Sequence, residues 1–124
     1  MTILLCEDNP IVARVACRVL TSLNYTVDLT TSGEQALYQY KQKNYTNLLV
    51  DMFLPNMNGL ECIRELRRLE SQNNNQENKA KFFIWTAAHE DVLDHPLFIH
   101  TDGLLAKPLK PTSKEFLSIF HRSV

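Results

Sequence analysis

The sequence contains little glycine and no long apolar run, and both shortages exclude classes of protein. Only three glycines occur among the 124 residues, and no glycine-rich loop follows the first apolar run, which disfavours the binding of a flavin or dinucleotide cofactor. No window approaches the roughly 18 consecutive apolar residues of a membrane-spanning helix, and the N-terminus lacks the basic-then-apolar layout of a signal peptide. We therefore expect no membrane insertion by this segment and a cytoplasmic location, or a place on the cytosolic side of a larger membrane-bound protein.

Cysteine is also scarce, and its spacing fits neither a disulfide framework nor a metal site. The three cysteines, Cys6, Cys17 and Cys62, are an odd number without a CxxC or Cys/His ligand pattern. Two of them fall in segments that we predict to be buried. The expected state is therefore free thiols in a reducing compartment.

The chain carries no excess of either charge. Its 13 Lys and Arg residues against 14 Asp and Glu residues give a formal net charge of −1, which argues against the basic face that sequence-independent nucleic-acid binding needs. With 44% hydrophobic and 22% charged residues, the composition is that of an ordinary globular protein. The length predicts one domain over residues 1–124, without direct nucleic-acid binding.

Short apolar runs alternate with longer amphipathic segments, which is typical of repeated βα units around a parallel sheet. The runs that predict strands are residues 3–6, 25–30, 48–51, 82–86 and 103–106. The segments that predict helices are residues 10–23, 32–40, 58–69 and 112–120. Residues 71–81 are polar and rich in asparagine, and we expect a loop there. Pro96 leaves room for only a short helix between the fourth and fifth strands. The expected fold class is α/β.

Five side chains with reactive or ligand-binding groups follow the predicted strands: Glu7, Asp8, Asp51, Thr86 and Lys107. In an open parallel α/β sheet, ligands bind outside the carboxyl ends of the strands. Three carboxylates packed together repel one another, and a bound hard cation such as Mg²⁺ relieves that repulsion. The acidic trio therefore predicts a Mg²⁺ site.

With Mg²⁺, this set has the parts for phosphoryl transfer. Asp51, at the end of the most apolar central run, is the best candidate nucleophile. Lys107 and Thr86 offer an ammonium and a hydroxyl for the phosphoryl oxygens. A phosphoaspartate would place about two negative charges where one carboxylate stood, which is enough to bias a two-state element.

At these positions the sequence resembles the response-regulator receiver domains of two-component signalling. The motifs that carry the resemblance are Glu7-Asp8, the segment from Asp51 through Pro55 to Gly59, Thr86-Ala87, Asp102-Gly103 and Lys107-Pro108. Each piece is weak alone, but the set is specific and covers essentially the whole chain. The resemblance implies a doubly wound, flavodoxin-like (βα)5 fold with a five-stranded parallel sheet in the order 2-1-3-4-5.

The resemblance also implies functional roles. Asp51 would accept phosphate from a histidine kinase or a histidine phosphotransfer protein, and Thr86 and Lys107 would bind the phosphoryl group. The implied Mg²⁺ ligands are Glu7, Asp8, Asp51 and the backbone carbonyl of Phe53. The resemblance further implies a cis peptide bond between Lys107 and Pro108. The chain would be either a stand-alone regulator or the receiver module of a hybrid histidine kinase.

The sequence departs from the family pattern at one position that concerns the readout of phosphorylation. The family usually has Tyr or Phe three residues before the lysine, and here that residue is Leu104. The usual coupling between the threonine and that ring cannot operate in this chain. Leu104 itself is expected to pack in the core.

Two other functions remain as alternatives. Leu104 is the main support for a receiver-like scaffold that binds its partner without phosphorylation. A Mg²⁺-dependent phosphohydrolase with an Asp nucleophile is the other, but such enzymes often have a second acid two residues after the nucleophile, where this chain has Phe53.

Overall fold

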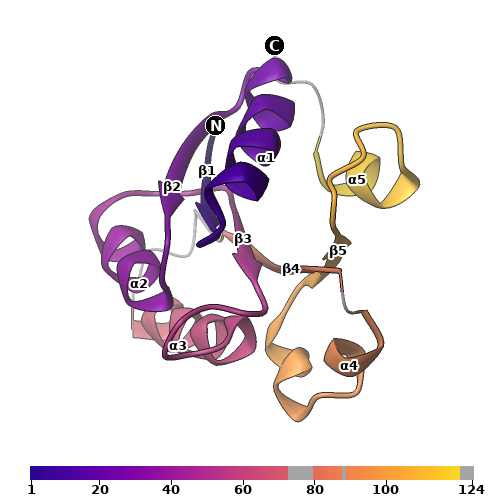
Figure 1. The fold of residues 1–124 in the computed structure, drawn as a ribbon. Coiled ribbons are helices and arrows are strands. Elements are labelled where there is room, and N and C mark those ends of the chain that lie inside the picture. The colour runs from indigo at the N-terminus through magenta and orange to yellow at the C-terminus, as the bar shows by residue number, and fades with distance from the viewer. Residues whose placement is uncertain (73–79, 88, 121–124) are drawn as a thin grey trace.

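The computed structural model describes residues 1–72, 80–87 and 89–120, which form a five-stranded parallel sheet with helices on both faces (Figure 1). The strand order is β2-β1-β3-β4-β5, which confirms the doubly wound fold that the resemblance implied. The elements in chain order are β1 (Thr2–Cys6), α1 (Pro10–Ser22), β2 (Thr26–Thr30), α2 (Gly33–Gln42), β3 (Asn47–Asp51), α3 (Gly59–Gln72), β4 (Lys81–Thr86), α4 (His89–Leu93), the 3-10 helix η1 (Pro96–His100), β5 (Gly103–Ala106) and α5 (Lys114–Ile119).

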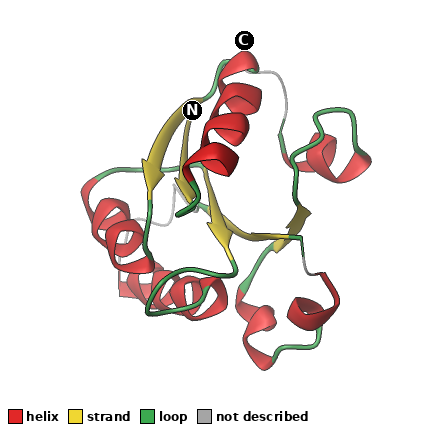
Figure 2. Ribbon diagram, in the orientation of Figure 1, coloured by secondary structure: helices red, strands yellow, loops and turns green. Residues whose placement is uncertain are grey.

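The central strands are apolar because both faces of the sheet are buried. Successive residues of β1, β3 and β4 alternate between two apolar clusters on opposite faces. In β3, Leu48 and Val50 join the cluster beneath α2 and α3, whereas Leu49 joins the cluster beneath α1 and α5. Figure 2 shows α2 and α3 together on one side of the sheet and α1 on the other. Because all five strands run parallel, their carboxyl ends lie at one edge of the sheet.

Side-chain caps set where α1 and α2 begin. The Asn9 side chain accepts the first free N–H groups of α1, and Pro10 occupies the first helical position. The Ser32 hydroxyl oxygen accepts the Gln35 N–H at 3.2 Å. Both helix starts are therefore as predicted from the sequence. Among the described helices, none has the length and apolar character needed to cross a bilayer.

The connection from β4 to β5 contains two short helices in place of one long helix. α4 ends at Leu93 and η1 begins at Pro96. Proline has no N–H with which to continue a preceding helix, and His95 Nδ1 accepts the Leu97 N–H at 3.1 Å to start the new turn. The prediction of only a short helix in this segment is confirmed.

α3 extends further than the sequence predicted. It continues to Gln72 and β4 begins at Lys81, so the loop prediction for residues 71–81 is wrong at its first two residues and at its last. Residues 73–79 lie outside the described part of the chain. Arg67 attaches this helix to the segment before β5. Its Nη2 lies 2.8 Å from Asp102 Oδ2, and its Nε donates to the His100 carbonyl at 2.8 Å.

The three cysteines are free, as expected. Cys6 and Cys62 are fully buried, and the Cys6 thiol donates to the Ser32 carbonyl at 3.2 Å. Burial raises the pKa of Cys6 to about 11 and also raises the pKa of Cys62. Because the thiolate is the reactive form, these two side chains act as small core residues.

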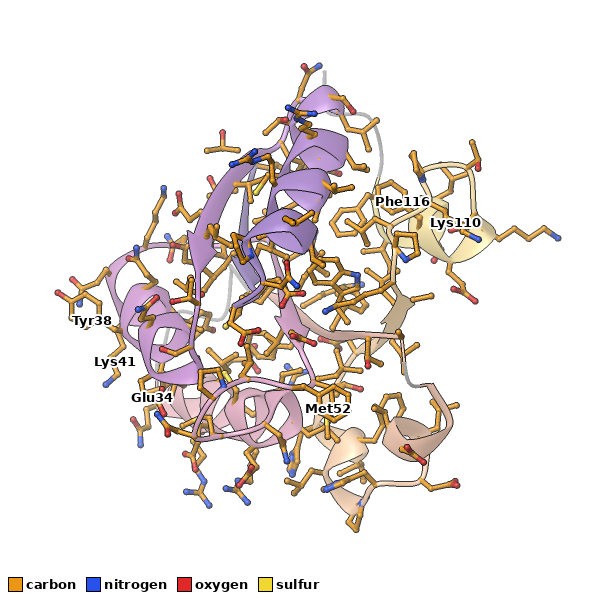
Figure 3. All side chains as sticks on the ribbon, in the orientation of Figure 1. Glu34, Tyr38, Lys41, Met52, Lys110 and Phe116 are labelled. Atoms are coloured by element: carbon orange, nitrogen blue, oxygen red, sulfur yellow. The ribbon has the colours of Figure 1, made fainter. Side chains whose placement is uncertain are left out.

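Gly59 allows α3 to begin directly against the end of β3. Its N–H donates to the Met52 carbonyl at 2.8 Å, and a Cβ at this position would lie 2.2 Å from the Asp51 carbonyl oxygen. That separation is far below van der Waals contact. Met52, labelled in Figure 3, packs against the cluster beneath α3. The start of α3 therefore fixes the strand end that carries Asp51.

We expect Gly59→Ala to lower the free energy of unfolding by about 1–3 kcal/mol, because the added methyl group must push α3 away from β3. Gly33→Ala is the control. A Cβ at Gly33 meets the flexible Met57 side chain, at 2.6 Å from its Cγ, and that side chain can move aside. Urea denaturation of both variants measures the difference, and equal losses would contradict the proposed close packing at Gly59.

Candidate functional site

The candidate site lies at the carboxyl edge of the sheet, where the central strands end. β1 and β3 are direct neighbours, so Glu7, which follows β1, lies beside Asp51 at the end of β3. Asp51 is in register with Trp85 of β4, and Thr86 extends that strand by one residue. Lys107 follows β5, and its N–H donates to the Thr86 carbonyl at 3.1 Å. Four strands thus bring the predicted residues to one edge.

Three carboxylates meet at this edge. Oxygen atoms of Glu7, Asp8 and Asp51 all lie within 4.8 Å of one another. Glu7 and Asp51 are only 2% and 5% exposed, whereas Asp8 is exposed. Backbone groups orient the two buried carboxylates: the Asn9 N–H donates to Glu7 Oε2 at 3.2 Å, and the Phe53 N–H donates to Asp51 Oδ1 at 3.3 Å.

The Lys107 ammonium lies between the two buried carboxylates. Its Nζ is 3.0 Å from Asp51 Oδ1 and also forms an ion pair with Glu7 Oε1. Buried carboxylates are costly unless a cation pairs with them, and Lys107 supplies that cation from the end of β5, on the far side of β4. The peptide bond between Lys107 and Pro108 is cis, as the resemblance implied. This bond follows directly after the site lysine.

The donor atoms of the acidic cluster suit a hard divalent cation. All three side chains offer carboxylate oxygens, which Mg²⁺ prefers over nitrogen or sulfur. Three carboxylates against one ammonium also leave the cluster with an excess of negative charge. Both the spacing of the oxygen atoms and this excess charge fit an ion such as Mg²⁺ at Glu7, Asp8 and Asp51.

The other predicted residues take different places around this cluster. Thr86 is buried at the end of β4, on the edge shared with Asp51. The Phe53 side chain is 64% exposed, so only its backbone is directed to the cluster. Leu104 is partly buried against the apolar cluster beneath α2 and α3, as expected for a core residue. Position 104 therefore contributes an aliphatic side chain to the core and no aromatic ring to the site.

The sequence did not predict the contact between Trp85 and the site lysine. The Lys107 Nζ lies 4.6 Å from the centroid of the Trp85 ring, and Trp85 is 1% exposed. Its position directly before Thr86 in an apolar strand predicts a core residue. Contact with the lysine follows from the strand register, because β4 lies between β3 and β5.

Known proteins that are similar in sequence and fold are receiver domains. The response regulator receiver domain family matches residues 3–115. The solved receiver domain of a sensor histidine kinase from Pseudomonas aeruginosa PAO1 is 34% identical, with a TM-score of 0.74 and coverage of 88% of this chain and 86% of that chain. Its structure holds a magnesium ion coordinated in the active site cleft. A response regulator receiver domain from Methylobacillus flagellatus is 25% identical, with a TM-score of 0.80 and coverage of 95% and 96%.

The curated relatives are much longer proteins. Sensor protein EvgS of Escherichia coli strain K12 is 38% identical over 71 residues, which are 57% of this chain and 6% of that protein. Response regulator ArlR of Staphylococcus haemolyticus is 39% identical over 69 residues, which are 56% of this chain and 32% of that protein. Phosphorylation on an aspartate is typical of such receivers. The fold, the strand-end residues and these matches together establish that the chain belongs to the response regulator receiver domain family of two-component systems.

Proposed function

We propose that this chain, as one domain over residues 1–124, accepts a phosphoryl group on Asp51 in a Mg²⁺-dependent reaction and thereby switches its partner interactions. The observation that carries the proposal is the meeting of the Glu7, Asp8 and Asp51 carboxylates within 4.8 Å, with the Lys107 ammonium on two of them. Stability alone does not favour such a cluster, because like charges repel at this distance.

Mg²⁺ is the proposed cofactor of this reaction. Glu7, Asp8 and Asp51 would hold it through carboxylate oxygens, and the proposed fourth ligand is the backbone carbonyl of Phe53. When bound, the ion would offset the negative charge of the phosphoryl oxygens. Support comes from the oxygen-only donor set and from the magnesium ion in the related Pseudomonas aeruginosa receiver domain.

In the proposed step, an Asp51 carboxylate oxygen attacks the phosphorus atom of a phosphohistidine. A P–O bond forms as the P–N bond breaks, and the leaving histidine nitrogen keeps the electron pair, so that a ring protonated at its other nitrogen leaves as neutral imidazole. Lys107 Nζ, which lies 3.0 Å from Asp51 Oδ1, would donate to a phosphoryl oxygen, and so would the Thr86 hydroxyl. Charge-assisted hydrogen bonds of this kind are the stronger class.

The proposed phosphodonor is a histidine kinase or a histidine phosphotransfer protein. The similarity of this chain to segments of sensor protein EvgS and response regulator ArlR supports a donor of the two-component class. Direct nucleic-acid binding is not part of the proposal, since the net charge of −1 provides no basic excess.

One observation favours a second candidate function. Leu104 packs against the apolar cluster at the position where receivers usually carry an aromatic switch residue. A receiver without that ring is a candidate for a scaffold that binds its partner without being phosphorylated. The two functions differ in whether Asp51 takes up phosphate at all.

Incubation with acetyl phosphate and Mg²⁺ is expected to add one phosphate to the chain, and Asp51→Asn is expected to add none, because an amide oxygen is a far weaker nucleophile than a carboxylate. Intact mass spectrometry measures both. Asp28→Asn is the matched control, since Asp28 lies away from the site and pairs with Lys43 at 2.9 Å. An adduct on the Asp51→Asn chain, or one independent of Mg²⁺, would contradict the proposal, and no adduct on any chain would favour the scaffold.

Removing the site ammonium is expected to destabilise the fold in the absence of Mg²⁺. Lys107→Met leaves Glu7 and Asp51 as unpaired buried carboxylates, and we expect the free energy of unfolding to fall by about 3–5 kcal/mol. Millimolar Mg²⁺ should restore much of this loss, because it returns positive charge to the same oxygens.

Lys43→Met provides the comparison for this prediction. Lys43 also pairs with an aspartate, but the pair is largely exposed, with side chains 47% and 26% accessible, so its loss should cost no more than about 1 kcal/mol. Urea denaturation with and without Mg²⁺ measures both variants. Equal losses, or a loss at Lys107 that Mg²⁺ does not reduce, would speak against the charge balance described for the site.

A further inference from the structure

The Lys107 ammonium has an aromatic neighbour in addition to its two carboxylates. Its Nζ lies 4.6 Å from the centroid of the Trp85 ring, within the range of a cation–π contact. Trp85 is 1% exposed and stands in register with Asp51 on one side and Leu105 on the other. The ammonium therefore meets Glu7, Asp51 and the face of an indole that the sheet holds in place.

The buried indole carries a cost that an ordinary core residue would avoid. Trp85 Nε1 has no hydrogen-bond partner among the described residues, and a buried N–H without a partner is unfavourable. A leucine or phenylalanine would fill an apolar site without that cost. In addition to its volume, tryptophan has the most electron-rich ring face of any side chain. The cation that lies over this face is the Lys107 ammonium.

We propose that Trp85 is a positioning residue for phosphoryl transfer, holding the Lys107 ammonium in place through its ring face. The inference rests on the proposed function of Asp51. Lysine has a flexible four-carbon stem, and the carboxylates attract its ammonium less once a divalent cation shares their charge. The ring keeps its attraction when the carboxylates are neutralised. Trp85 should therefore affect transfer of the phosphoryl group and leave metal binding largely unchanged.

Fluorinated tryptophan provides a test that separates the ring's charge distribution from its size. Trp85 is the one tryptophan in the sequence, so biosynthetic incorporation replaces this residue alone. Fluorine draws electron density from the ring face and weakens its attraction for a cation with little change in volume. We expect phosphorylation by acetyl phosphate to slow along the series tryptophan, 5-fluorotryptophan and tetrafluorotryptophan, by about tenfold overall.

Two further measurements separate positioning from a general structural role. Calorimetric titration of Mg²⁺ should give dissociation constants that agree within about twofold across the series, because fluorination of the ring leaves the oxygen atoms of the proposed metal ligands unchanged. The ¹⁹F resonance of the 5-fluorotryptophan chain should shift when Lys107→Met removes the cation. Trp85→Phe, which keeps a weaker ring face, should phosphorylate faster than Trp85→Leu.

Three results would overturn the inference. Equal phosphorylation rates across the fluorinated series would show that the ring face does not act on the transfer step. Parallel losses of Mg²⁺ affinity and phosphorylation would indicate a distorted site, and an unchanged ¹⁹F resonance in Lys107→Met would exclude the contact. Failure of the unsubstituted chain to take up phosphate, in contrast, would overturn the proposed function itself.

Discussion

The ion pair of Lys107 with two buried carboxylates is the interaction on which the site depends. Glu7 and Asp51 are almost fully buried at neighbouring strand ends, and without a cation their charges would repel in a medium that screens poorly. The lysine from the end of β5 provides that cation. The carboxylates that bind this ammonium are the same groups that would bind a metal ion.

The parallel sheet is what makes this arrangement possible. Residues as far apart in sequence as Glu7 and Lys107 meet because every strand ends at the same edge. Gly59 secures the central strand, since only a residue without a Cβ allows α3 to start against the Asp51 carbonyl. The Trp85 ring adds an apolar support beneath the lysine. The geometry of the site thus comes from strand register and close packing.

The α/β class and the gathering of the acidic residues at one sheet edge were predictable from local patterns in the sequence, whereas the strand order was implied by the resemblance to receiver domains. Apolar runs and caps such as Asn9 and Ser32 located the elements, and strand ends located the acidic trio. The contacts that the sequence did not reveal depend on register and on side-chain direction. The position of Trp85 beneath Lys107 is one such contact. The extension of α3 to Gln72 is another miss, since polar helix ends have no apolar periodicity to mark them.

The proposed carrier of the phosphoryl group is the Asp51 carboxylate. Borohydride reduces an acyl phosphate to an alcohol, so treatment of the phosphorylated chain converts the modified aspartate to homoserine, which tandem mass spectrometry locates. We expect homoserine at residue 51 and at no other aspartate. Homoserine at Asp8 or elsewhere, or a stable phosphate adduct that borohydride does not reduce, would contradict it.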